Sequence, residues 1–370
     1  MMHILIAPDS FKESLSAQEV ALALKEGFQA KLPGATFDLA PIGDGGEGTL
    51  EALAHNLDLT DAEVVLPHAF SENGRARYAS KGQQAVFEMA EVCGLEKVPL
   101  NKRNPLTLST QGIGEMMTIL YDKGIRDLII GVGGSSTNDG GIGMAKALGY
   151  RFFDQSGHEL EAIGENLGKV ATFSSQDVKS LSGLKVTVVT DVTNPLCGPK
   201  GATVTFGRQK GLAEADFDRV DRAMSHFYSQ VNPSALHLSG AGAGGGMAAG
   251  LVTFASGQIV SGIDFVLDTI QFDDRVKKAD LVIVGEGRLD AQSLSGKAPV
   301  GVARRTPEQV PVIAICGSLS EDLPSFPTAG ISAAFPIISK VQPLEETLAD
   351  AAVNLRRTAE NIANLLCLKE

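Results

Sequence analysis

Short apolar runs that end in turn residues alternate along this chain with segments whose apolar residues recur at helical spacing. Such runs predict five buried strands, within residues 3–10, 36–42, 280–284, 311–317 and 331–338. Residues 16–30 predict a helix that opens with a capping box formed by Ser16 and Glu19. The stretch GTLEALAHN predicts the start of another helix, and residues 343–366 predict one long amphipathic helix. Strands that are apolar on both faces and separated by helices indicate a parallel sheet.

The middle of the chain has a different pattern. RARYAS and QAVFEMA predict paired strands, and TQGIGEMMTILYDKG predicts a helix that is followed by the strand DLIIGVGG. KVTVVTDVTNP predicts a further strand that ends in a turn. A chain of 370 residues exceeds what one core usually supports. We therefore predict an α/β protein with two α/β domains: a discontinuous domain, 1–65 plus 260–370, with five parallel strands, and an inserted domain, 66–259.

Composition narrows the class of partner and the compartment. A net charge of -12 and a pI of about 5.1 argue against a nucleic-acid or anionic-membrane partner, which would need a basic face. The four cysteines are far apart, with no C-x-x-C pair, which argues against a zinc site and favours reduced thiols. No apolar run approaches 18 residues, and the N-terminus lacks the pattern of a signal peptide. We expect a cytoplasmic protein.

Acidic residues follow the predicted strands in glycine-rich or small polar turns. The acids and their neighbours are Asp9-Ser10, Asp44 with Glu47, Asn138-Asp139, Asp191, and Glu286 with Asp290. Ligands of parallel α/β sheets bind beyond the carboxyl ends of the strands, so these side chains are expected to converge on one crevice. Clustered carboxylates need a cation, and Mg²⁺ with a phosphate-bearing ligand is the natural occupant. Each turn by itself is explained equally well by local capping of the backbone by Asp.

The stretch GEGRLDAQSLSGK, 285–297, has the setting of a phosphate loop but not the Walker A sequence. Ala291 stands where the motif requires its first glycine, and Ala298 stands where it requires Ser or Thr. A phosphate at this acidic loop would need a metal, together with cations such as Lys12 and Lys297. GAGAGG at 240–245 does match the dinucleotide-binding spacing, but it lacks a clear preceding strand. A packed helix start whose N–H groups face an anion is the preferred interpretation of that stretch.

Six blocks in order along the chain resemble the bacterial type I glycerate kinases, which are glycerate 2-kinases that lack a P-loop. The blocks are APDSFKESLSA, GDGGEGT, GGSSTNDGG, DVTNPLCGPKGA, GAGAGGGMAAG and GEGRLDAQSLSGKAPVGVA. The likeness runs from about residue 3 to beyond 360. One departure is FGRQKG, where Arg208 replaces the proline expected in this family. The resemblance implies phosphorylation of D-glycerate with ATP and Mg²⁺, to 2-phosphoglycerate, on two domains of which one is flavodoxin-like. The active site is expected in the cleft between these domains.

The roles of individual residues are our hypothesis on top of that resemblance. Asp191 is the first choice as acceptor of the hydroxyl proton, because it ends an apolar strand and is followed by the polar turn Thr193-Asn194, and Asp290 is the second. Lys297 is expected to neutralise the transferred phosphoryl group. The remaining assignments are substrate binding by Asp9, Ser10, Lys12, Asn138 and Arg288; nucleotide or phosphate binding by Gly242, Gly244, Gly285, Gly287 and Gly296; and metal binding by Asp44, Asp139 and Glu286.

Three alternatives to this function stay open at the level of sequence. The first is a kinase of another small hydroxy acid. The second is a dehydrogenase of such an acid, which would need a catalytic histidine near a glycine loop; none of the six histidines lies in a glycine cluster. The third is a two-domain protein that binds a small anion without turnover. The expected partners are D-glycerate and ATP, and a homodimer is an open option.

Overall fold

The computed structural model describes residues 1–71, 73–291 and 293–368, which form two compact units. The first unit contains Met1–Asp44, Glu51–Asp58 and Gly262–Glu370, and the second contains Gly45–Leu50 and Leu59–Ser261. This division differs from the predicted boundary at residue 65. The reason is that β3, Thr60–Leu66, pairs antiparallel with β4, Gly74–Lys81, and so belongs to the second unit.

The first unit is built on a five-stranded sheet in the order β15-β13-β11-β1-β2. All four of its strand pairs are parallel. By order of appearance along the chain this is the flavodoxin-like arrangement, which confirms the predicted fold class. The strands are β1 His3–Pro8, β2 Thr36–Leu39, β11 Leu281–Gly285, β13 Val312–Cys316 and β15 Ala333–Pro336, with a short parallel pair, β12 Arg288–Leu289 and β14 Ser318–Leu319. All five predicted strands of this sheet are present.

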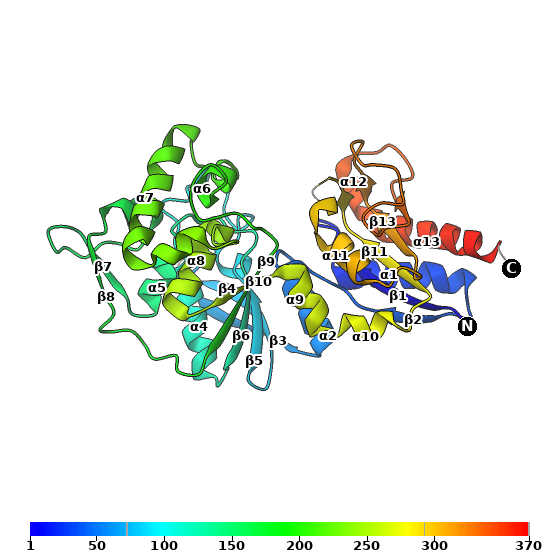
Figure 1. The fold of residues 1–370 in the computed structure, drawn as a ribbon, viewed down its shortest axis with the longest axis horizontal. Coiled ribbons are helices and arrows are strands. Elements are labelled where there is room, and N and C mark those ends of the chain that lie inside the picture. The colour runs from blue at the N-terminus through cyan, green and yellow to red at the C-terminus, as the bar shows by residue number, and fades with distance from the viewer. Residues whose placement is uncertain (72, 292, 369–370) are drawn as a thin grey trace. The chain divides into compact units, whose positions relative to one another are not determined.

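The helices of the first unit bury both faces of its sheet. They are α1 Ala17–Lys31, α2 Thr49–Leu57, α9 Gly262–Thr269, α10 Phe272–Val276, α11 Ala298–Arg305, α12 Leu344–Ala349 and α13 Ala351–Cys367, with a 3₁₀ turn at Ser293–Ser295. The predicted capping box at Ser16 and Glu19 opens α1. In α1, Val20, Leu24 and Phe28 share one apolar face, which packs with α13 and strands β1 and β11 in a single core (Figure 1).

The predicted helix over 343–366 is interrupted. Asp350, with φ -83° and ψ 0°, separates α12 from α13, and its carboxylate accepts a hydrogen bond from Gln342 and pairs with Lys340. None of the six residues of α12 is buried, whereas α13 buries Leu355 and Ile362 in the core. Packing therefore supports only the second segment, and the polar contacts of Asp350 bend the chain between the two.

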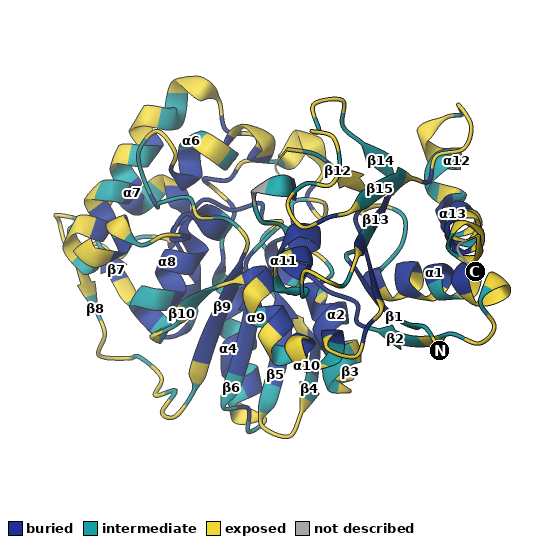
Figure 2. Cartoon of the chain, turned by 45° about the vertical axis from the view of Figure 1, so that its right-hand side comes forward, coloured by how far each residue is buried: buried dark blue, intermediate teal, exposed yellow. Residues whose placement is uncertain are grey.

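The second unit is built on a six-stranded mixed sheet in the order β10-β9-β6-β5-β4-β3. Its first four strands are parallel and the last two are antiparallel, so the predicted pairing of RARYAS with QAVFEMA is confirmed. The remaining strands are β5 Gln84–Glu88, β6 Asp127–Gly131, β9 Lys185–Thr190 and β10 Gln258–Ser261, with a separate pair, β7 Arg151–Phe153 and β8 Thr172–Ser174. Strands β5, β6 and β9 are almost fully buried (Figure 2).

Helices complete the second unit. They are α3 Ala90–Cys93, α4 Gln111–Asp122, α5 Ile142–Ala147, α6 Ala202–Phe206, α7 Phe217–Val231 and α8 Ala243–Ala255, with 3₁₀ turns at Leu100–Lys102, Gly164–Lys169, Arg208–Lys210, Glu214–Asp216 and Pro233–His237. Helix α4 confirms the helix predicted from TQGIGEMMTILYDKG. The outer face of α7 is exposed, and its inner face contributes Met224, Phe227 and Tyr228 to the core of this unit (Figure 2).

Candidate functional site

Three predicted acids of the first unit lie at one edge of its sheet. Asp9, Asp44 and Glu286 follow the carboxyl ends of β1, β2 and β11, which are adjacent strands. Backbone hydrogen bonds hold the strand ends together: Asp9 N donates to Gly285 O over 2.8 Å, and Ile42 N donates to Pro8 O over 3.0 Å. The order of the strands reverses between β1 and β11, and such a switch point is where parallel α/β sheets bind ligands.

The electrostatics of this acidic edge favour a bound cation. Glu286 is only 8 % exposed, and its Oε1 has no hydrogen-bond partner among the described residues. Burial raises the pKa of Glu286 to about 7, the charges of Asp290 and Asp44 add to this rise, and a hydrogen bond with Ser293 and the charge of Lys297 oppose it. Burial, and then the charge of Asp44, also raise the pKa of Asp9 well above its ordinary value. A positive ion at this edge would relieve the mutual repulsion.

The loop that follows Glu286 is ordered by the neighbouring strand. Gly317 N donates to Glu286 O over 3.1 Å, and Ser318 N donates to Gly287 O over 3.0 Å. Within the loop, Asp290 Oδ1 accepts a hydrogen bond of 2.9 Å from Ser293 N. The loop ends at Lys297, which is the N-cap residue of α11. The first turn of a helix carries N–H groups and partial positive charge that favour an anion.

Three glycines of this loop were predicted to bind nucleotide or phosphate, and the structure requires glycine at these positions to different degrees. A Cβ on Gly285 would lie 2.4 Å from Ile315 O, so its lack of a side chain is needed for packing of the strands. Gly296 has φ +122°, which a residue with a side chain rarely adopts. A Cβ on Gly287 would make only ordinary contacts, 3.7 Å from Lys12 N and Phe11 Cα. The turn after β1 and the loop after β11 therefore lie against each other.

That proximity brings predicted substrate-binding residues to the acidic edge. Ser10 N donates to Asp9 Oδ1 over 2.7 Å, and the buried Oγ of Ser10 has no partner among the described residues. Lys12 is exposed, and its charge acts on Asp9, whose pKa it lowers against the larger effect of burial. Arg288 is exposed as well, with Nη2 3.5 Å from Ser320 Oγ. Cationic groups thus accompany the carboxylates on these two segments.

The other predicted acids belong to the second unit. Asp139 is fully buried, and its carboxylate accepts hydrogen bonds from Thr110 N, Thr110 Oγ1, Gly141 N and Gly143 N. These contacts hold the loop after β6 against α4 and α5, which gives Asp139 a structural role. Its assignment as a metal ligand stays a prediction. Asn138 is also buried and donates to Thr203 Oγ1 over 3.0 Å. Asp191 follows β9 directly and is exposed.

A buried lysine of the second unit is absent from the predicted site residues. Lys210 is 2 % exposed and donates to Ser135 Oγ and Thr137 O, each over 2.7 Å. Burial lowers its pKa to about 7, against the opposing charge of Asp139. The signal for this site in the sequence is weak: within FGRQKG, Gly207 and Gly211 flank the short turn RQK, and the structure gives Gly211 a φ of +93°. Arg208 of the same turn is exposed and forms an ion pair with Glu214.

The glycine-rich stretch 240–245 is not a dinucleotide-binding loop. It follows the 3₁₀ turn Pro233–His237 rather than a strand, and Gly244, Gly245 and Gly246 all have positive φ. A Cβ on Gly242 would lie 2.4 Å from Pro195 O, and one on Gly244 would lie 2.7 Å from Met89 Sδ. Close packing inside the second unit therefore requires glycine at both positions, and their predicted contact with a nucleotide or phosphate stays a prediction.

The described residues contain no helix that is long and apolar enough to cross a membrane. They also contain no group of three His, Cys, Asp or Glu side chains placed to hold a metal ion by themselves. A divalent ion at the acidic edge would therefore share its coordination with a ligand or water, as Mg²⁺ does in phosphate sites.

Comparison with known proteins identifies the family. The model of the glycerate kinase family matches residues 4–367. A glycerate kinase from Neisseria meningitidis is 52% identical over 366 residues, covering 99% of both chains, and a glycerate 2-kinase from Escherichia coli is 40% identical over 379 residues, covering 99% of this chain and 98% of its own. The crystal structure of a protein assigned as glycerate kinase 2 from Salmonella typhimurium LT2 has a TM-score of 0.86 and 40% identity, covering 100% of this chain and 99% of that one. The chain belongs to the glycerate kinase family of phosphotransferases.

Proposed function

We propose that this protein transfers the γ-phosphoryl group of ATP to D-glycerate, with Mg²⁺, to give 2-phosphoglycerate. The observation that carries the proposal is the acidic edge of the first unit, where Asp9, Asp44 and Glu286 lie at adjacent strand ends beside the loop that leads to Lys297. The position of the new phosphate rests on the name of the Escherichia coli relative, a glycerate 2-kinase.

The residues at this edge fit a magnesium ion. The edge offers carboxylate oxygens, which are ligands that Mg²⁺ prefers, and the buried Oε1 of Glu286 lacks a partner among the described residues. Glu286 and Asp44 would hold the ion. Their charges raise the pKa of neighbouring carboxyl groups when no cation is present, so a cation between them would be stabilising. When bound, Mg²⁺ would supply positive charge that neutralises the phosphoryl group during transfer.

The residues around the acidic edge would bind and orient the two substrates. Lys297, at the start of α11, would neutralise the transferred phosphoryl group, and Gly296 would allow the phosphates to approach the backbone. Lys12 and Arg288 would bind the carboxylate of glycerate, since charge-assisted hydrogen bonds are the strong ones. Ser10 offers a buried hydroxyl with no described partner, which suits hydrogen bonding to a substrate hydroxyl.

Two carboxylates are candidates for accepting the proton of the attacking hydroxyl. Asp290 is half-buried in the phosphate loop, where the backbone N–H of Ser293 orients its carboxylate. Asp191 follows β9 of the second unit and is exposed. Loss of a general base typically lowers turnover by about 10²- to 10⁴-fold, so replacing each with asparagine distinguishes the two.

The decisive experiment measures ADP release with D-glycerate, ATP and Mg²⁺, with and without EDTA, and identifies the product by phosphorus NMR. We expect EDTA-sensitive turnover to a single isomer, 2-phosphoglycerate. Folded protein that releases no ADP above the control without glycerate would refute the proposal, and 3-phosphoglycerate as product would refute its regiochemistry. Asp322→Asn, at an exposed position after β14, serves as the control for the two aspartate variants.

A further inference from the structure

A cavity of about 550 Å³ lies along α11 in the first unit. At one end it is lined by Leu294, which sits in the loop between Asp290 and Lys297. From there it follows Val300 and Arg304, which are one helical turn apart on α11, to Val310 before β13. The cavity therefore begins at the proposed phosphate loop and continues toward the other end of α11, the helix drawn in orange-yellow in Figure 1.

The walls of the cavity are fixed by close packing. A Cβ on Gly301 would lie 2.3 Å from Ile263 Cγ1, so one face of α11 is pressed against α9. On another side, Gly330 has φ +82°, and a Cβ there would lie 3.2 Å from Ala303 Cβ. The turn that contains Gly330 is closed by hydrogen bonds between Thr328 and Ile331 in both directions. The cavity is therefore bounded by a rigid helix and a tight turn.

The lining combines apolar side chains with polar and charged ones: Thr306 and Ser332 contribute hydroxyl groups, Glu308 a carboxylate and Arg304 a guanidinium. Apolar side chains come from α11, from the segment before β13 and from the turn before β15. Arg305 is engaged with Asp268 and Asp273, whereas its neighbour Arg304 is exposed and has no ion-pair partner among the described residues. A Cβ on Gly296 would lie 3.1 Å from Arg304 Nη2, so this guanidinium rests against the phosphate loop. A guanidinium can stack on an aromatic ring and can pair with phosphate.

We infer that this cavity binds the purine base and ribose of the nucleoside triphosphate. The inference rests on the proposed kinase function and adds the place of the nucleoside. The volume falls within the range of small-molecule sites. The eight residues of α11 span about 12 Å, which a ribose and triphosphate chain can cover between the apolar walls and Lys297. Arg304 would lie where the base and the phosphates meet.

Photolabelling with 8-azido-ATP locates the nucleoside directly. Trypsin cleaves after Arg288, Lys297, Arg304, Arg305 and Lys340, so the cavity is represented by the peptides 289–297, 298–304 and 306–340. We expect the label in these three peptides, and we expect excess ATP to prevent it. Label that ATP displaces but that is found only in peptides from residues 59–261 would overturn the inference. This measurement needs no turnover, so it stays informative if the proposed reaction fails.

A pair of matched variants tests the cavity through kinetics. Val310→Phe places a ring in the cavity, and Val341→Phe makes the same change at a fully exposed position. We expect Val310→Phe to raise the KM for ATP about tenfold or more, because the larger ring would occupy space that the base needs, with the KM for glycerate and the Tm unchanged. An unchanged KM for ATP in an active, folded Val310→Phe protein would overturn the inference and leave the proposed reaction standing. Absence of turnover in the unsubstituted protein would refute the proposed reaction instead.

Arg304→Ala provides a second variant that does not alter the shape of the apolar walls. Its control is Arg222→Ala, at an exposed position of α7 in the second unit. We expect several-fold weaker binding of ADP to Arg304→Ala by calorimetry and wild-type binding to Arg222→Ala. Equal affinity in both variants would remove Arg304 from the site.

Discussion

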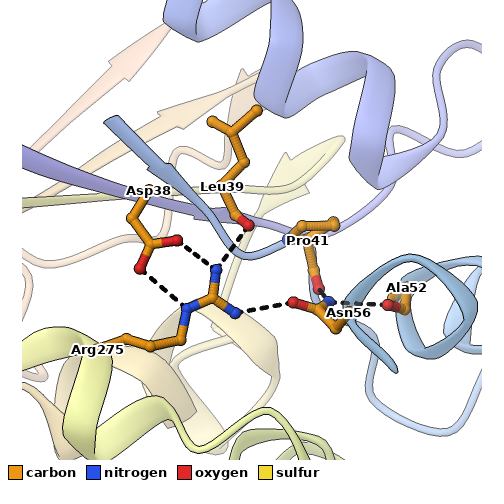
Figure 3. A network of polar contacts seen from close by, with 6 residues as sticks. All are labelled: Asp38, Leu39, Pro41, Ala52, Asn56 and Arg275. Atoms are coloured by element: carbon orange, nitrogen blue, oxygen red, sulfur yellow. Dashed lines mark hydrogen bonds and ion pairs between the residues drawn. The ribbon is translucent and has the colours of Figure 1, made fainter. Parts of the chain in front are cut away.

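Arg275 of α10 joins three segments of the first unit, and its removal should destabilise that unit measurably. Its guanidinium donates to both carboxylate oxygens of Asp38 on β2, over 2.5 and 3.0 Å, to Leu39 O over 2.7 Å and to Asn56 Oδ1 over 2.8 Å (Figure 3). Asn56 of α2 donates in turn to Pro41 O and Ala52 O. The network fixes the end of β2, from which the chain continues to Asp44.

The expected loss follows from the burial of the pair. The side chains of Arg275 and Asp38 are 22% and 27% exposed, so this ion pair is intermediate between a fully buried pair and a surface pair. Breaking a buried pair typically costs 3–5 kcal/mol, and an exposed pair contributes roughly 0–1 kcal/mol. Arg275→Ala also leaves Leu39 O and Asn56 Oδ1 without their donor, although water can reach part of the site. We expect the free energy of unfolding of the first unit to fall by about 3 kcal/mol.

The aromatic residues of the chain allow the two units to be followed separately. The chain has no tryptophan, and its four tyrosines, Tyr78, Tyr121, Tyr150 and Tyr228, all lie in the second unit. Phe335→Trp, at a half-buried position of β15, would place the only tryptophan in the first unit. Urea unfolding followed by tryptophan emission then reports the first unit, and tyrosine emission reports the second.

The control for Arg275→Ala lies two residues further along the chain. Lys277 pairs with Asp274 on the surface, with both side chains about two-thirds exposed or more, so Lys277→Ala should cost less than about 0.5 kcal/mol. A loss below about 1 kcal/mol for Arg275→Ala would refute the reasoning. The reasoning would also be refuted if the losses in unfolding free energy of Arg275→Ala and Asp38→Ala simply add in the double mutant, because residues in one network are expected to couple.

Three further predictions follow from buried groups and close approaches. Because the pKa of Glu286 is raised from 4.5 to about 7, the folded state binds the proton of this carboxyl more tightly than the unfolded state does. The free energy of unfolding should therefore fall by about 3 kcal/mol as pH rises from 4.5 to 7 or above, and Asp9 acts in the same direction. Glu286→Gln should make the free energy of unfolding, measured by urea titration, depend less on pH. An equal slope in Glu286→Gln would contradict this. Gly27→Ala should lower the free energy of unfolding by about 2 kcal/mol, because the new Cβ would lie 2.3 Å from Arg356 O. Its control, Gly34→Ala, should be neutral, since a Cβ there would have nothing within 4 Å. Equal Tm values for the two variants would contradict this prediction. Asp139→Asn should destabilise the second unit by about 2–3 kcal/mol, since an amide nitrogen would face N–H donors, and unchanged unfolding by tyrosine emission would contradict that role.

The sequence was sufficient to predict the first unit because its strands carry the simplest signal. LVIV, 281–284, and VIAIC, 312–316, are apolar at every position, as expected for strands of a sheet that is covered on both faces, and their spacing leaves room for a helix between them. The capping box of α1 is equally local, since Ser16 and Glu19 are three residues apart. Features of this kind depend on neighbours in sequence, and they are present as predicted.

Features that depend on distant residues could not be predicted in the same way. Asp139 and Glu286 both lie among small residues after a strand, so the sequence pattern predicts the same role, metal binding, for both. The structure separates them: four donors surround the carboxylate of Asp139, whereas Oε1 of Glu286 has no described partner. The break at Asp350 was missed for the same reason, because its cause is a contact with Lys340 and Gln342 rather than a helix-breaking residue.

The acidic edge combines a structural cost with a chemical use. Three carboxylates lie at adjacent strand ends, and burial, with a smaller contribution from the charges of the neighbouring acids, raises the pKa values of Asp9 and Glu286. Lys12 and Lys297 act on the edge, but burial and the neighbouring acids outweigh them. A carboxylate whose pKa is about 7 holds its proton loosely near neutral pH, so a divalent ion can displace that proton at little cost. In the proposed function, the burial and charge repulsion that raise these pKa values would therefore also favour binding of a divalent cation at this edge.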